Sequence, residues 1–160
     1  MQRAPPRGFT LIELMVAMAV LVILLLAALP GYSDKLVREQ VVEALPLADL
    51  AKLPIELAWR LEQPLPADNA AAGLPAADKI VNQRVNAVTV EHGAIHIQFG
   101  NQAHKLLQGK VLTVRPAGVD DARVVPVTWL CGPSPVPEKM TAQGENRTSV
   151  SVGLLPRRCR

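Results

Sequence analysis

The sequence predicts an α+β fold, in which one long N-terminal helix packs on a four-stranded antiparallel sheet. Three observations predict this class. An unbroken apolar run extends from Leu14 to Leu29, apolar residues then recur at helical spacing over residues 37–48, and alternation of apolar and polar residues begins near Asn86. The chain has 160 residues, and once the leader and the apolar run are subtracted, the remainder is enough for one small domain with a modest core.

The N-terminal segment combines a basic leader, residues 1–8, with a hydrophobic helix that carries Glu13 almost at its start. Residues 9–29 would extend roughly 31 Å as a helix, enough for the roughly 30 Å hydrocarbon core of a membrane. A secretory signal fits poorly, because no Ala-x-Ala-like cleavage site follows the apolar run. A plain signal anchor explains the length, but a carboxylate costs about 2.5–3.5 kcal/mol near the bilayer centre, so Glu13 needs a further reason.

An amphipathic helix is predicted beyond the apolar run, so that the N-terminal helix covers residues 9–61 in all. Its apolar face needs a partner, which the sheet can supply. Pro30 and Gly31 interrupt the apolar pattern, but we expect the helix to continue past them. We also expect a kink or break near Pro46 and Pro54, because proline removes a helical hydrogen bond. The positions on the apolar face are Val37, Val41, Ala44, Leu45 and Ala48.

The predicted sheet lies within residues 85–131, after an irregular connection, residues 62–84, that is rich in proline and alanine. A His-Gly turn at residues 92–93 should join the first two strands, and His96 and Gln98 should face solvent. The four strands are expected at residues 86–91, 94–99, 110–115 and 125–131. Ile95, Ile97 and Phe99 are expected to share one face, Leu112 and Val114 to face inward, and Val125, Val127 and Trp129 to share one face of the last strand.

Two cysteines, Cys131 and Cys159, lie in the last third of the chain. In a domain outside the cytoplasm an even pair predicts a disulfide, which would close a C-terminal loop over residues 132–160. Such a loop contributes on the order of 3–4 kcal/mol in the chain-entropy model. The alternative is two free thiols in a reducing compartment, which is disfavoured because the apolar anchor places the domain outside the cytoplasm. A zinc site is disfavoured because the two cysteines lack the close, paired spacing of zinc ligands.

Composition argues against several other functions. The formal charge of +3 falls to about +1 when the leader's two arginines are removed, and the chain has no Lys/Arg-rich run, so a nucleic-acid partner is disfavoured. His92, His96 and His104 are expected to be solvated. Asn146, Arg147 and Thr148 match the pattern of an N-glycosylation acceptor, but such triplets often occur by chance, so this match does not predict glycosylation. No catalytic motif is present, so we expect no enzyme activity, no catalytic residue, no metal and no cofactor.

Two stretches carry a family resemblance. The first is GFTLIELMVAMAVLVILL at residues 8–25, which closely resembles the class III processing site and anchor of a type IV prepilin. The second is the C-terminal end, where Thr-Trp-Leu-Cys-Gly at residues 128–132 and Leu-Pro-Arg-Arg-Cys-Arg at residues 155–160 resemble the Trp-x-Cys and Leu-Pro-x-x-Cys-Arg-like ends of major type IVa pilins. The resemblance therefore covers both ends of the chain and the sheet between them.

The resemblance implies how the subunit is processed and assembled. A dedicated peptidase would cut after Gly8, and the new N-terminal Phe9 would be N-methylated. The first half of the helix would protrude from the domain, serving first as a transmembrane segment and then as the filament core. Glu13 would pair with the terminal amine of Phe9 on a neighbouring subunit. In the alternative, Glu13 is a solvated carboxylate at the membrane surface, near the start of the helix, where the helix dipole favours a negative charge. The two cysteines would bound the family's C-terminal disulfide loop.

The function that the resemblance implies is that of a structural subunit of a type IV pilus, with roles in adhesion and twitching motility. Its partners would be other pilin subunits, the prepilin peptidase, the inner-membrane assembly machinery and the membrane itself. It would lie in the inner membrane of a Gram-negative-like bacterium before assembly, and in an extracellular pilus afterwards. Three alternatives stay open: a pseudopilin of a type II secretion system, a DNA-binding minor pilin and, more remotely, an anchored periplasmic enzyme.

Overall fold

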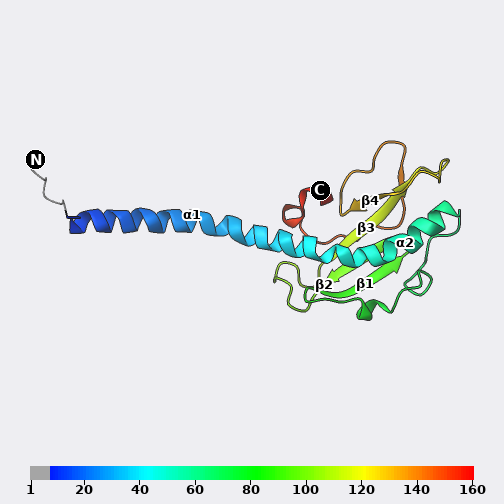
Figure 1. Ribbon diagram of the computed structural model, residues 1–160, viewed down its shortest axis with the longest axis horizontal. Helices are drawn as coiled ribbons and strands as arrows, with labels where there is room; N and C mark the ends of the chain where they lie inside the picture. The colour runs from blue at the N-terminus through cyan, green and yellow to red at the C-terminus, as the bar shows by residue number, and fades with distance from the viewer. Residues whose placement is uncertain (1–7) are drawn as a thin grey trace, which may run out of the picture. The chain divides into compact units, whose positions relative to one another are not determined.

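A computed structural model describes residues 8–160, with the side chains of residues 28–32 outside that description. Most of the predicted leader, residues 1–7, lies outside the described residues. The chain divides into two compact units, Met1–Lys35 and Leu36–Arg160 (Figure 1). The first unit is helical where it is described, and the second holds the sheet.

Helix α1, Leu11–Ala44, has 34 residues and belongs to both units. Its backbone stays helical through Pro30 and Gly31, so the helix continues beyond the apolar run as predicted. A proline removes only one hydrogen bond of the ladder, and a helix of this length can lose one bond and continue.

Helix α2, Pro46–Arg60, follows α1 after the single residue Leu45. The predicted break is confirmed at Pro46, which occupies the first helical turn, where its missing N–H leaves no donor unpaired. The break is slight, because Leu45 keeps helical dihedrals of −60° and −36°. At Pro54 the prediction is wrong, since α2 runs through this residue. Glu62, the residue after the C-cap Leu61, has a φ of 55°, the left-handed conformation common after a last helical turn.

The sheet is antiparallel, as predicted; its strand order is β1-β2-β3-β4, and a fifth, two-residue strand pairs with β3. The prediction missed β5 because it lies inside the 132–160 loop and is too short to show alternation. The sharp turn between β1 and β2 is confirmed, with φ of 47° and 82° at His92 and Gly93. The strands are β1 Val85–Glu91, β2 Ala94–Phe99, β3 Val111–Gly118, β4 Thr128–Cys131 and β5 Thr141–Ala142.

Two strand boundaries differ from the prediction. β3 continues to Gly118 rather than ending at residue 115, because its last residues pair with both β4 and β5. β4 begins at Thr128 rather than at Val125, and Val125 is exposed. Pro126 has no N–H to donate to a ladder, and Val125 instead donates to the carbonyl oxygen of Ala122 in a turn.

The core of the second unit lies between the helical apolar face and one face of the sheet (Figure 1). The predicted helical face is confirmed, and Ala51 and Ile55 of α2 extend it. Each fully buried large apolar side chain contributes about 1.5–3 kcal/mol relative to an exposed one, so this face fixes the helix on the sheet. The fully or nearly fully buried members are Val37, Val41, Ala44, Ala48, Ala51, Ile55, Ile95, Ile97, Phe99, Leu112 and Val114.

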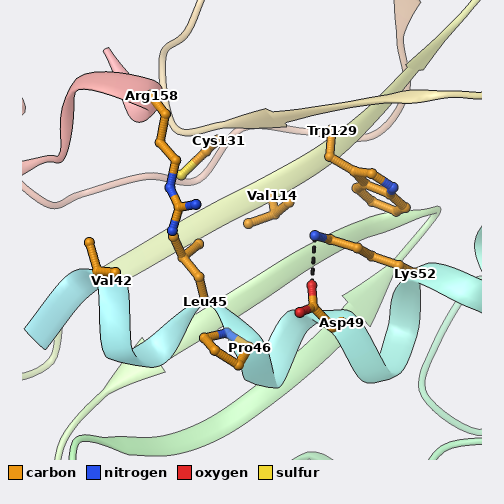
Figure 2. Close-up of a pocket in the computed structure, with 9 residues that line it drawn as sticks. All are labelled: Val42, Leu45, Pro46, Asp49, Lys52, Val114, Trp129, Cys131 and Arg158. Carbon is orange, nitrogen blue, oxygen red and sulfur yellow. Dashed lines mark ion pairs between the residues drawn. The ribbon is translucent and has the colours of Figure 1, made fainter.

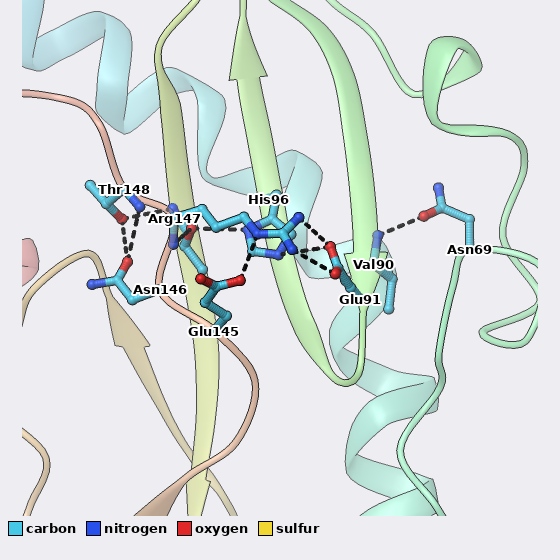
Figure 3. A network of polar contacts seen from close by, with 9 residues as sticks. Asn69, Val90, Glu91, His96, Glu145, Asn146, Arg147 and Thr148 are labelled. Carbon is cyan, nitrogen blue, oxygen red and sulfur yellow. Dashed lines mark hydrogen bonds and ion pairs between the residues drawn. The ribbon is translucent and has the colours of Figure 1, made fainter.

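The connection between α2 and β1 is irregular, as predicted, apart from a short turn at Ala77–Lys79. Asn69 fixes it to the sheet and is only 8% exposed. Its Nδ2 donates to the carbonyl oxygens of Pro75 and Val88, at 3.0 and 2.9 Å, and its Oδ1 accepts from the N–H of Val90 at 2.6 Å (Figure 3). The sequence analysis missed this residue, because an asparagine in a loop gives no sign of a distant partner.

Candidate functional site

The start of α1 is built by a reciprocal cap between Thr10 and Glu13. The hydroxyl of Thr10 accepts from the backbone N–H of Glu13 at 3.3 Å. In return, Oε2 of Glu13 accepts from the backbone N–H and the hydroxyl of Thr10, at 3.1 and 3.0 Å. This is a capping box, and its sequence signature, a threonine three residues before a glutamate, was missed in the sequence analysis.

The same segment leaves its apolar side chains exposed within the chain. Phe9 is 86% exposed, and the large apolar residues of α1 as far as Leu26 are each at least half exposed. Gly8 is exposed too, and a methyl group added to it would meet no atom within 4 Å. A helix that is hydrophobic all round is normally buried by something else. Over the described residues, no helix meets the length and apolarity required to cross a membrane.

At the other end of the chain, Cys131 and Cys159 form the predicted disulfide. The S–S distance is 2.00 Å and the Cα atoms lie 4.5 Å apart. Both half-cystines are buried beside Leu155. Gly132 follows Cys131 with a φ of 60°, and an added Cβ there would lie 3.0 Å from the carbonyl oxygen of Cys159, so glycine is needed for this close approach.

Within the disulfide loop, residues 145–149 lie along the first half of β3, where β4 does not reach. Ser149 donates its N–H to the carbonyl oxygen of Val111 at 2.9 Å, and its hydroxyl accepts from the N–H of Val111 at 2.9 Å. The hydroxyl of Thr148 accepts from the N–H of Thr113 at 3.1 Å. The hydroxyl of Thr113 accepts from the N–H of Arg147 at 3.0 Å. Most of the hydrogen bonds between this segment and β3 are therefore made by side-chain hydroxyl groups, where a paired strand would use its backbone.

The prediction that His96 is solvated is wrong, since this side chain is 7% exposed. Alternation does place it on the outer face of the sheet, but the 145–149 segment covers that face. Nδ1 of His96 lies 3.0 Å from the hydroxyl of Thr113, and Nε2 lies 3.9 Å from Oε2 of Glu91 (Figure 3). Of the other histidines, His92 is exposed and His104 is half-buried.

Arg147 completes this cluster (Figure 3). Its guanidinium binds the carboxylate of Glu91 through both terminal nitrogens, with Nη2 at 2.7 Å from Oε1, while its Nε donates to Glu145 at 2.9 Å. Burial first, and then the positive charge of Arg147, lower the pKa of His96; Glu91 and Glu145 oppose that shift. Burial beside this ion pair therefore favours the neutral form of the ring.

A groove of about 360 Å³ lies between the helices and β4 (Figure 2). Its polar side chains mostly bind each other: Lys52 lies 2.7 Å from Asp49 and 5.5 Å from the centre of the Trp129 ring. The indole N–H of Trp129 donates to Glu56 at 2.8 Å. The residues that line the groove are Val42, Leu45, Pro46, Asp49, Lys52, Val114, Trp129, Cys131 and Arg158. No three His, Cys, Asp or Glu side chains among the described residues come together as metal ligands.

An exposed apolar helix, joined to a sheet domain whose C-terminal segment is closed by a disulfide, fits a protein whose N-terminal helix is covered by a membrane or by other chains. Comparison with known proteins agrees. Residues 37–160 match the pilin family of bacterial filaments, and residues 3–29 match the prokaryotic N-terminal methylation motif. The chain belongs to the pilin family.

Three relatives illustrate the similarity. The chain is 34% identical to a protein named type IV major pilin protein PilE of Neisseria gonorrhoeae, over 96% of this chain and 93% of that protein. It is 30% identical to a fimbrial protein of Neisseria meningitidis serogroup B, over 91% and 84% of the two chains. It is 36% identical to the fimbrial protein EcpC of Eikenella corrodens, over 78% and 81%. The function is that of a structural pilus subunit, and neither a pseudopilin nor a DNA-binding minor pilin is favoured.

Proposed function

We propose that the subunit is cut between Gly8 and Phe9 by a prepilin peptidase, methylated at the Phe9 amine, and polymerised through residues 9–29. Before assembly these residues hold the chain in the inner membrane, and the assembly machinery there inserts it into an extracellular type IV pilus. Adhesion and twitching motility follow from that location. Contacts between subunits that do not close into a ring generate an open helical filament.

The observation that carries this proposal is the exposed apolar helix that begins directly after an accessible glycine. Leaving so many large apolar side chains in water is unfavourable by about 25 cal/mol for each Å² of surface, and each is at least half exposed in the single chain. A membrane and a bundle of identical helices both remove that cost. One segment can therefore serve in both settings, provided that its carboxylate is paired in each.

Glu13 is the only charged residue from Gly8 to Ser33. Both hydrogen bonds from Thr10 reach Oε2, and Oε1 accepts neither of them. An ionised carboxylate has lone pairs for about four donors, so the cap leaves capacity for a second partner. We propose that this second partner is the ammonium group of Phe9 on a neighbouring subunit. Phe9 has a free ammonium group only after the leader has been cleaved. Processing and assembly are thereby coupled through one ion pair.

Intact-mass analysis of filaments sheared from cells tests the processing step. The expected chain begins at Phe9 and carries one additional methyl group. Gly8→Val should retain the leader and yield no filaments, whereas Gly153→Val should be processed normally. These glycines are a matched pair, because a Cβ at either position meets no atom within 4 Å. A surface subunit that starts at Met1 or near Pro30 would contradict the proposal.

A further inference from the structure

Arg147 holds the 145–149 segment across the sheet. The segment lies at the free half of the β3 edge, whereas Glu91, the partner of Arg147, belongs to β1 at the far edge. The guanidinium therefore spans β3 and β2 on the outer face of the sheet, and His96 of β2 lies beneath it (Figure 3). The remaining attachments are three hydrogen bonds to hydroxyl groups and two to carbonyl oxygens, one from the N–H of Ser149 to Val111 and one from Nδ2 of Asn146 to Gly132 at 3.0 Å. Such a segment opens at a lower cost in free energy than a strand inside the sheet.

The surroundings of His96 favour the neutral ring on balance, although Glu91 and Glu145 favour the protonated form. The hydroxyl of Thr113 already accepts the N–H of Arg147, so its own hydrogen is available to Nδ1 of His96. A proton on Nδ1 abolishes that acceptor. It also places a second cation beneath the guanidinium, in competition for the carboxylate of Glu91. Nε2 is buried and has no hydrogen-bond partner among the described residues.

The charged groups that act on the ring come from two elements: β1 contributes Glu91, and the 145–149 segment contributes Glu145 and Arg147. Arg115 of β3 lies on the same face of the sheet, two residues after Thr113, but its charge is not among the causes that shift the pKa of His96. The strand neighbours of His96 across β1 and along β2 are Thr89 and Gln98, which are uncharged. A protonated imidazole therefore adds a second cation next to Arg147, and the two cations compete for the same carboxylates.

We propose that His96 is the proton sensor of a latch, in which protonation of its ring weakens the Arg147–Glu91 ion pair and releases the 145–149 segment from β3. The disulfide and the ladder between β1, β2 and β3 remain in place, so the released segment stays attached at both ends. The pilin surface formed by this segment would thus differ between neutral and acidic surroundings.

The sign of the effect follows from proton linkage. In the latched state the pKa of His96 lies below its ordinary value of 6.5, and in the released state the solvated ring regains that value. The released state therefore binds the proton more readily, and opening becomes more favourable as the pH falls from 6.5 towards the lowered pKa. At still lower pH both states are protonated and the effect saturates. The opening equilibrium increases about tenfold for each unit by which the pKa is lowered.

Hydrogen exchange of the full-length chain in detergent micelles, followed by NMR between pH 8 and pH 4.5, tests the latch. Protection factors, which correct for the intrinsic pH dependence of exchange, should fall at the amides of Arg147, Ser149 and Thr113. The amides of the β1–β2 ladder should keep their protection. The midpoint of the change must coincide with the titration of the His96 ring, observed directly through its carbon-bound protons.

His96→Asn keeps a polar group near the hydroxyl of Thr113 and cannot take up the proton, so its segment should stay protected at pH 5. His92→Asn is the matched control, because His92 is exposed and asparagine tolerates its positive φ; this variant should respond as the wild type does. Glu91→Gln should leave the segment weakly protected at every pH. Unchanged protection in the wild type at pH 5, an equal loss in His96→Asn, or loss together with the β1–β2 ladder would each overturn the proposal.

Discussion

Replacing Glu13 with glutamine separates the two roles that this carboxylate can have. In the capping box it accepts hydrogen bonds from Thr10, and in the proposed filament it pairs with the Phe9 amine of a neighbour. Glutamine can still accept the backbone hydrogen bond at this position of a capping box, but it carries no charge. The reverse change is Thr10→Ala, which removes the cap and keeps the carboxylate.

The two variants differ in expected magnitude. Loss of the cap in Thr10→Ala costs about 0.5–2 kcal/mol and is confined to the first turn. The rest of the 34-residue helix remains intact, so filaments should still form. Glu13→Gln leaves an ammonium group unpaired in an apolar contact, which costs about 3–5 kcal/mol. That cost lowers the association constant at each such contact by about two to four orders of magnitude.

The assay compares filament yield by electron microscopy with the amount of subunit in the membrane, for cells that produce only the variant chain. Glu13→Gln should be made and inserted, yet give few or no filaments, while Thr10→Ala should assemble. Wild-type yield from Glu13→Gln at normal subunit levels would refute the ion pair. Equal loss in both variants would show that Glu13 acts as a cap alone.

Two further predictions concern the stability of the sheet domain. Replacing both Cys131 and Cys159 with serine should lower the free energy of unfolding by on the order of 2–4 kcal/mol in a denaturant titration, and reactive thiols in the folded, unreduced wild type would contradict the bond. Gly118→Ala should destabilise by about 1–3 kcal/mol, because its Cβ would lie 2.3 Å from Cζ2 of Trp59. Gly153→Ala, where the added Cβ meets no atom within 4 Å, is the control and should be neutral.

The regular parts of the fold could be predicted because their signals are local. The buried face of the helices recurs every three or four residues, and the inward residues of β2 recur every second residue, so each follows from neighbours in the sequence. Pro54 was misjudged for the same reason: a local rule predicts a break, whereas the burial of Ile55 and its neighbours against the sheet stabilises the helix across it.

The errors at the candidate sites involve partners far away in the chain. Alternation correctly placed His96 on the outer face of the sheet, but it carries no information about a segment 50 residues later that covers that face. The bonds of Asn69 to β1 and the pairing of β5 with β3 are non-local in the same way. The cap at Thr10 differs, because its signal is local and was overlooked in favour of the charge on Glu13.

The bonds of Asn69 have a consequence for how copies of this chain meet. β1 is an edge strand, and an edge with free N–H and C=O groups invites a strand from another molecule to add to it. The amide of Asn69 binds the carbonyl oxygen of Val88 and the N–H of Val90 as the peptide group of a neighbouring strand would. Among closely packed identical copies, these two backbone groups of β1 are therefore not available to a strand of another subunit. Strand addition between sheet domains at this edge is thereby disfavoured, which is compatible with the proposed association through the N-terminal helices.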